Sequence, residues 1–166
     1  MQNTYFVDGV RTPFGKAGEK GVYWNTRADD LVVKAMIGLL DRNQSVPKEA
    51  IDDVAIAATT QVGDQGLTIG RTAAILAGLP NTVPGFAIDR MCAGAMTAVA
   101  MTGSAIATGA YDVVLAGGVE HMGRHPMGFD ADPNPRFIAE KLVNPDALNM
   151  GNTAEKIHDR FPVLSL

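Results

Sequence analysis

The stretch from Met91 to Tyr111 contains no charged residue and directly follows a short apolar segment. A chargeless stretch of this length suits a lipid bilayer or the interior of a protein. It consists mostly of Ala, Gly, Thr and Ser, with a single Ile and no Leu or Phe, so insertion into lipid would gain little free energy. We therefore expect a helix buried in protein, whose small side chains let neighbouring elements approach closely.

Strand-like and helix-like patterns alternate around this stretch. Strands are expected at residues 4–10, 51–59, 85–89 and 112–118, where short apolar runs are bounded by turn residues. Helices are expected at residues 26–40, at residues 68–77 and after Cys92. This alternation predicts an α/β fold with a mostly parallel mixed sheet, right-handed crossovers and alternating helices, including the buried helix that bears the cysteine.

Two local signals refine this outline. Thr26 precedes Asp29 by the spacing of a capping box, so the Thr26 hydroxyl is expected to accept from amides of the first helical turn. After Gly118 the sequence becomes dense in Pro, Gly and Asp, which predicts a long ordered loop. Helical pieces are expected beyond it, near 138–142 and 153–159. The organisation of the chain should therefore change near Gly118.

Cys92, the only cysteine, lies where the third expected strand gives way to the chargeless helix. Open α/β sheets usually bind ligands at this edge. The unpaired amides of a first helical turn stabilise a thiolate and can hold a developing oxyanion. Position alone leaves two interpretations equally open, because a free cysteine is also among the most commonly buried and inert residues. Cys92 is thus either a nucleophile or a packing residue.

Composition narrows the class of protein. The chain has 166 residues, enough for one sizeable core, and a net charge of −4 without a basic stripe, which argues against a nucleic-acid partner. A single cysteine excludes an internal disulfide and fits a reducing compartment, and the first residues do not resemble a signal or transit peptide. We expect a cytoplasmic protein without a membrane span.

The remaining polar candidates favour structural roles. His121, His125 and His158 are the only histidines, and a histidine in a loop rich in Gly and Pro is more often packed than catalytic. His121 and His125 have helical metal-ligand spacing, but the intervening Gly123 and the following Pro126 argue against a helix, so no metal site is predicted. Asp89 and Arg90 are interpreted as a structural ion pair, with each other or across a subunit interface. Arg11 and Arg71 are given no role.

Four segments, taken in their order and spacing, resemble the thiolase family. They are "VDGVRTPFGK" near the start, "AIDRMCAGAMTAVAM" around the cysteine, "GGVEHMGRHPMG" after the fourth expected strand and "MGNTAEKI" near the end. The "GGVEHM" segment is most similar to that of the acetyl-CoA C-acyltransferases (3-ketoacyl-CoA thiolases) of fatty-acid β-oxidation. Each motif alone is weak, whereas four in register across nearly the whole chain are specific.

The resemblance implies a function and two functional residues. Cys92 would accept the acyl group of a 3-ketoacyl-CoA, acetyl-CoA would leave, and a second coenzyme A would collect the shortened acyl chain. The amide of Cys92 would form part of an oxyanion hole, and Met150 would line the acyl pocket. Coenzyme A would be a substrate, and no bound cofactor is implied. The family also implies a homodimer or homotetramer, and a β-oxidation multienzyme complex as a partner.

The resemblance also implies a domain layout. Residues 1–118 would be the α/β amino-terminal domain and residues 119–166 the beginning of an inserted loop domain. The carboxy-terminal half, which in thiolases carries the histidine of a Gly-His-Pro loop, a second cysteine and an asparagine loop, would be absent. Acyl transfer needs a base beside the thiol, so we expect this chain to be inactive alone.

One departure from the family keeps alternatives open. The cysteine loop of thiolases usually reads Cys-x-Ser, whereas here it reads Cys92-Ala93-Gly94. The missing hydroxyl bears on loop hydrogen bonding and substrate preference. A biosynthetic thiolase that forms acetoacetyl-CoA, a decarboxylating ketoacyl synthase, and a non-catalytic protein that binds coenzyme A or lipid on the same scaffold therefore remain as alternative functions.

Overall fold

A computed structural model describes residues 2–161 of the chain. Its contacts divide the chain into two compact units, Met1–Asp130 and Ala131–Leu166, which are described separately below. The domain boundary expected near Gly118 from the sequence stays a prediction.

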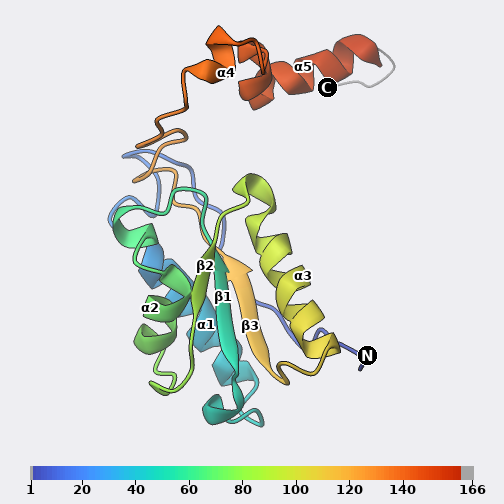
Figure 1. Ribbon diagram of the computed structural model, residues 1–166. Coiled ribbons are helices and arrows are strands. Elements are labelled where there is room, and N and C mark those ends of the chain that lie inside the picture. Colours follow the sequence, from blue (N-terminus) through green and yellow to red (C-terminus); the bar gives the residue numbers. More distant parts are fainter. Residues whose placement is uncertain (1, 162–166) are drawn as a thin grey trace. The chain divides into compact units, whose positions relative to one another are not determined.

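The first unit is built on three parallel strands, β1 (Asp53–Ala57), β2 (Phe86–Ile88) and β3 (Val114–Gly118), in the order β2-β1-β3 (Figure 1). Ala57 pairs in register with Ile88 on one side and with Gly118 on the other, so the three strands end level with one another. The α/β class and these three strands confirm the sequence prediction. Because every pairing in the described sheet is parallel, the sheet is not mixed.

The strand predicted at residues 4–10 is absent from the sheet, and that prediction was wrong. The polar groups of this segment bond to helix ends instead of a strand. The amide of Gln2 donates to the Ala107 carbonyl at 3.0 Å, and the Thr4 hydroxyl donates to the Gly103 carbonyl at 3.0 Å. The carboxylate of Asp8 accepts from Arg42 at 3.0 Å. With both ends held in this way, the apolar side chains between them lie exposed, and no ladder forms.

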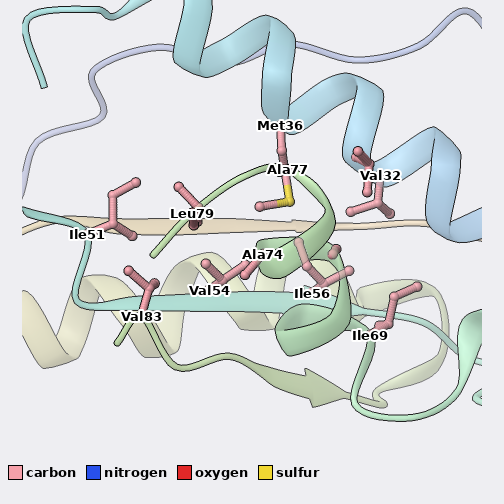
Figure 2. Close-up of a cluster of buried hydrophobic side chains, with 12 residues drawn as sticks. Val32, Met36, Ile51, Val54, Ile56, Ile69, Ala74, Ala77, Leu79 and Val83 are labelled. Atoms are coloured by element: carbon pink, nitrogen blue, oxygen red, sulfur yellow. The ribbon is translucent and has the colours of Figure 1, made fainter. Parts of the chain in front are cut away.

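Helices cover both faces of the sheet (Figure 1). Helices α1 (Ala28–Arg42) and α2 (Ile69–Leu76) pack against each other and against β1, and α3 (Gly94–Ala107) packs on β1 and β3 from the other side. The main apolar cluster lies between α1, α2 and the sheet (Figure 2). Its members are Val32, Val33, Met36, Ile51, Val54, Ile56, Ile69, Ala73, Ala74, Ala77, Leu79 and Val83.

Helix α1 begins one residue later than the sequence suggested, and the predicted capping box does not form. Arg27 is the N-cap and has no side-chain bond to the first turn. The Ala28 amide donates instead to Oδ2 of Asp64, which lies on the 3₁₀ turn Gly63–Gln65, at 3.2 Å. A buried carboxylate from another loop therefore performs the capping that was expected of Thr26.

Helix α3 is less buried than its composition predicts. Gly94, Ala98 and Thr102 form the buried stripe, which faces the sheet, whereas the outward side exposes Met96, Val99 and Met101. The prediction of a buried cysteine-bearing helix is therefore wrong for the helix as a whole within this chain, because only the sheet covers it. In residues 2–161 no helix combines the length and the apolar character needed to cross a membrane.

The second unit contains two helices, α4 (Arg136–Ala139) and α5 (Met150–Arg160), and a 3₁₀ turn at Pro145–Leu148. Asn149 caps α5, because its Oδ1 accepts from the amide of Gly151 at 2.9 Å. The helical pieces expected near 138–142 and 153–159 are thus present with shifted bounds.

The exposed apolar side of α3 predicts self-association of the chain. We expect wild-type chain to sediment faster than a monomer, and the double variant Met96→Lys/Met101→Lys to return to the monomer value in sedimentation velocity. Met127→Lys is the matched control, because Met127 is 76% exposed, as Met96 is 73% exposed, but lies outside α3. A wild-type chain that stays monomeric at high concentration would contradict the prediction.

Candidate functional site

The carboxyl ends of the three strands gather the residues that the sequence singled out. The loop after β1 carries Thr59 to Gln65, the turn after β2 carries Cys92, and the loop after β3 carries Glu120 to His125. Because Ala57, Ile88 and Gly118 end level with one another, these three loops begin at the same edge of the sheet. This is the edge at which open parallel sheets bind ligands.

The cysteine turn is held by its own backbone and by Asp89. Oδ1 of Asp89 accepts from the amide of Met91 at 2.9 Å, and the Ala93 amide donates to the Arg90 carbonyl at 3.1 Å. Met91 has a φ of 48°, in the left-handed region that a residue with a Cβ adopts at a cost of about 1–2 kcal/mol. The chain thus turns sharply from β2 into α3 immediately before the thiol.

The expected ion pair between Asp89 and Arg90 is wrong. The ion pairs that residues 2–161 make involve other groups, and the Asp89 carboxylate is used by the turn. A pair between one of these residues and another subunit stays a prediction.

Cys92 lies on the 3₁₀ turn Met91–Ala93, directly before the first residue of α3, and is exposed. This is the junction of strand and helix that the sequence predicted. The amide of Cys92 has no acceptor among the residues that the structure describes, whereas the amides of Ala93 and Gly94 donate within the turn. The arrangement offers an accessible sulfur beside an unpaired N–H group, which is the geometry that a nucleophile with its own oxyanion donor needs.

Gln65 is a buried hydrogen-bonding centre that the sequence gave no reason to select. Its side chain is 0% exposed and links the loop after β1 to the loop after β3. Nε2 donates to the Thr60 carbonyl at 2.8 Å and to Oε1 of Glu120 at 2.9 Å, and Oε1 accepts from the His121 amide at 2.6 Å. The other oxygen of Glu120 accepts from the Thr59 amide at 2.7 Å. The two loops are therefore joined at their base.

His121 is a structural residue, as the sequence interpretation favoured. It is buried, its Nε2 bonds to the Tyr23 carbonyl at 2.8 Å, and its Nδ1 accepts from the Arg124 amide at 3.2 Å. Both ring nitrogens are occupied, so neither is placed to take a proton from a thiol.

His125 is also buried and belongs to a charged cluster with Asp64. Nε2 of His125 bonds to Oδ1 of Asp64, while Nδ1 is buried without a partner among the described residues. Nε of Arg124 lies 3.0 Å from Oδ2 of Asp64. Burial raises the pKa of Asp64, but the bonds from His125 and Ala28 and the charge of Arg124 outweigh it, so the pKa lies below its ordinary value.

A pocket of about 340 Å³ lies beside these loops. The segment 10–17, helix α1 and residues 118–123 line it. Arg11 in its wall stacks over the ring of Phe14 at 4.9 Å. Arg71 lies elsewhere and donates to the carbonyls of Val83 and Asn81. Both arginines are accounted for by local contacts, which agrees with the absence of a role for them in the sequence interpretation.

Met150 is the first residue of α5, in the second unit, and its side chain is 57% exposed. Its expected place in an acyl pocket stays a prediction.

Comparison with known proteins gives a consistent family. The family model described as "Thiolase, N-terminal domain" matches residues 4–164. A 3-ketoacyl-CoA thiolase of Pseudoalteromonas translucida (strain TAC 125) is 43% identical over 155 residues, which are 93% of this chain and 39% of that protein. A 3-ketoacyl-CoA thiolase of Idiomarina loihiensis (strain ATCC BAA-735 / DSM 15497 / L2-TR) is 38% identical over 163 residues, 98% of this chain and 41% of the relative. The chain thus spans about two fifths of the length of these relatives.

The Asp64 cluster predicts a pH-dependent contribution to stability. Because folding lowers the pKa of Asp64 from 3.8, the stabilising charge is fully present above that value and is lost as the pH falls through the folded-state pKa. Asp64→Asn should lower the free energy of unfolding at neutral pH by about 1–3 kcal/mol. Urea titrations should show this difference shrinking below about pH 4.

Asp132→Asn, at an exposed carboxylate in the second unit, serves as the control and should leave stability unchanged at every pH. A difference between wild type and Asp64→Asn that stays constant from neutral to acid pH would show that the charge of Asp64 contributes nothing.

Proposed function

This chain belongs to the thiolase family through its match to the amino-terminal thiolase domain, and we propose that it carries the acyl-accepting cysteine of a 3-ketoacyl-CoA thiolase. The observation that supports this role is the position of Cys92, exposed on the turn between β2 and α3 with its own amide unpaired among the described residues. The proposed substrate class follows from the names of the relatives, which are 3-ketoacyl-CoA thiolases.

In the proposed reaction the Cys92 thiolate attacks the 3-keto carbon of the substrate. The carbonyl electron pair moves onto oxygen, where the amide of Cys92 donates to the developing charge. When the carbonyl re-forms, the bond between C2 and C3 breaks and the electron pair leaves on C2 of acetyl-CoA, which then takes a proton. The acyl group remains as a thioester on Cys92. A second coenzyme A thiol attacks this thioester, releases the shortened acyl-CoA and restores the cysteine.

We propose that this chain performs the acyl transfer slowly and does not turn over alone. Two proton transfers in the reaction need a base, to deprotonate the thiol and to handle C2. His121 has both ring nitrogens occupied, and His125 bonds to Asp64. The sequence holds no second cysteine. The first unit therefore offers a nucleophile and an oxyanion donor but no histidine arranged as their base.

The further features implied by the family remain proposals for the protein that contains this chain. They are a cytoplasmic location, a role in fatty-acid β-oxidation, assembly as a dimer or tetramer, association with a β-oxidation multienzyme complex, and a contact of Met150 with the acyl chain. Met150 is exposed at the start of α5, which leaves its side chain accessible to a ligand.

An acylation assay tests the role of Cys92. Incubation with acetoacetyl-CoA should add one acetyl group to the chain, and peptide mass spectrometry should locate it on Cys92. Cys92→Ala should take up none. Binding of acetoacetyl-CoA without an adduct would contradict the proposal and favour a non-catalytic protein that binds coenzyme A.

The same assay with added coenzyme A tests whether the chain turns over. We expect acetyl-CoA release to stop near one equivalent per chain, because no described histidine is placed to reset the cysteine for a further cycle. The measurement is acetyl-CoA formed against time, with Cys92→Ala as the blank. Sustained release over many equivalents would show that residues of this chain supply the missing base.

A further inference from the structure

The first turn of α3 rests on the end of β1 with no space between them. A Cβ added at Gly94 would lie 2.8 Å from the Cβ of Ala57, the last residue of β1. Non-bonded carbon atoms ordinarily lie about 3.5–4.0 Å apart. A side chain at position 94 would therefore displace the helix start from the strand by about 1 Å.

Space, and not backbone conformation, explains the glycine. Gly94 has φ −58° and ψ −51°, which is ordinary right-handed helix that alanine adopts more readily than glycine. Gly118 at the end of β3 repeats the pattern, because a Cβ there would lie 3.0 Å from the Ala57 carbonyl oxygen and 3.1 Å from the Cβ of Ala95. Ala57 is thus enclosed by two glycines, one on α3 and one on β3.

This contact lies two residues from Cys92 and is tied to it. The Gly94 amide donates to the Met91 carbonyl, and the Ala93 amide donates to the Arg90 carbonyl, so the turn that carries Cys92 and the first residue of α3 form one hydrogen-bonded unit. A shift of Gly94 away from β1 would carry the sulfur and its amide with it. The loops after β1 and β3 would stay behind, because the Gln65 and Glu120 bonds fix them to each other.

We propose that the contact between Ala57 and Gly94 positions Cys92 relative to the loops at the carboxyl edge of the sheet. Gly94 and Ala57 are positioning residues, since neither would touch the substrate. The consequence for acyl transfer rests on the proposed function, whereas the contact itself is testable without it.

A double-mutant cycle tests the proposal. Gly94→Ala should slow acylation of Cys92 by acetoacetyl-CoA at least about tenfold, because a displacement near 1 Å of reacting groups costs up to about a hundredfold. Alkylation by iodoacetamide should change less than about twofold, because the exposed thiol keeps the amides of its own turn. Ala57→Gly/Gly94→Ala should recover acylation to near the Ala57→Gly value, because the second change removes the clashing carbon.

The matched control is Gly103→Ala, in the same helix. A Cβ at Gly103 would lie 3.6 Å from Cγ2 of Thr4, which is an ordinary contact, so acylation should stay at the wild-type rate. The amide resonance of Cys92 in ¹⁵N-labelled chain reports the displacement directly. It should move in Gly94→Ala, return toward wild type in the double variant and stay in place in Gly103→Ala.

The outcomes separate the two proposals. If wild-type Cys92 takes up no acyl group, the proposed function fails, and the Cys92 resonance still decides on the contact. Independent effects of the two substitutions on that resonance and on the free energy of unfolding would overturn the positioning proposal. If Gly94→Ala does not fold, Gly118→Ala, which crowds Ala95 at 3.1 Å, should move the Cys92 resonance in a folded chain, and an unmoved resonance would overturn the proposal.

Discussion

Strand β1 is buried along its whole length, and the other elements of the first unit are placed against it. It pairs with β2 on one side and β3 on the other, so all its backbone groups in the sheet are satisfied within the molecule. Val54 and Ile56 point into the cluster with α1 and α2, whereas Ala57 points to α3. Each large aliphatic side chain buried there contributes about 1.5–3 kcal/mol. The small residues on the opposite face instead determine how closely α3 approaches.

The carboxyl end of β1 is consequently the reference for the candidate site. Its last residue meets α3 through Gly94, and the loop that follows it carries Asp64 and Gln65. Asp64 caps α1 and holds His125, while Gln65 joins the loops after β1 and β3. Leaving any of these buried groups unpaired costs about 1–3 kcal/mol, more than each bond contributes when it is made. The loops beside Cys92 are therefore held less by their own sequence than by the need to satisfy two buried side chains.

These relationships explain what the sequence predicted well and what it did not. The strands of the sheet and the junction at Cys92 were predictable because each depends on local patterns, an apolar run and the helix that follows it. The roles of Asp64 and Gln65 were not, because their partners lie 36 to 61 residues away in the sequence. Residues 4–10 have a strand-like pattern, but long-range bonds to the ends of α1 and α3 override it. Gly94 attracted notice for the hydroxyl it lacks, whereas the structure gives weight to the Cβ it lacks.

Helix α3 shows why a composition signal can be right about chemistry and wrong about environment. Its two sides differ in side-chain size and not in polarity, since Gly94, Ala98 and Thr102 recur every four residues on the sheet side while methionines and a valine face outward. A chargeless helix with this pattern packs closely on one side and leaves apolar surface on the other. Polarity alone could not tell the two sides apart, so the sequence suggested burial all round. Side-chain volume marks the side that meets the sheet, and the same small residues bring the helix start, with its cysteine, to the ends of the strands.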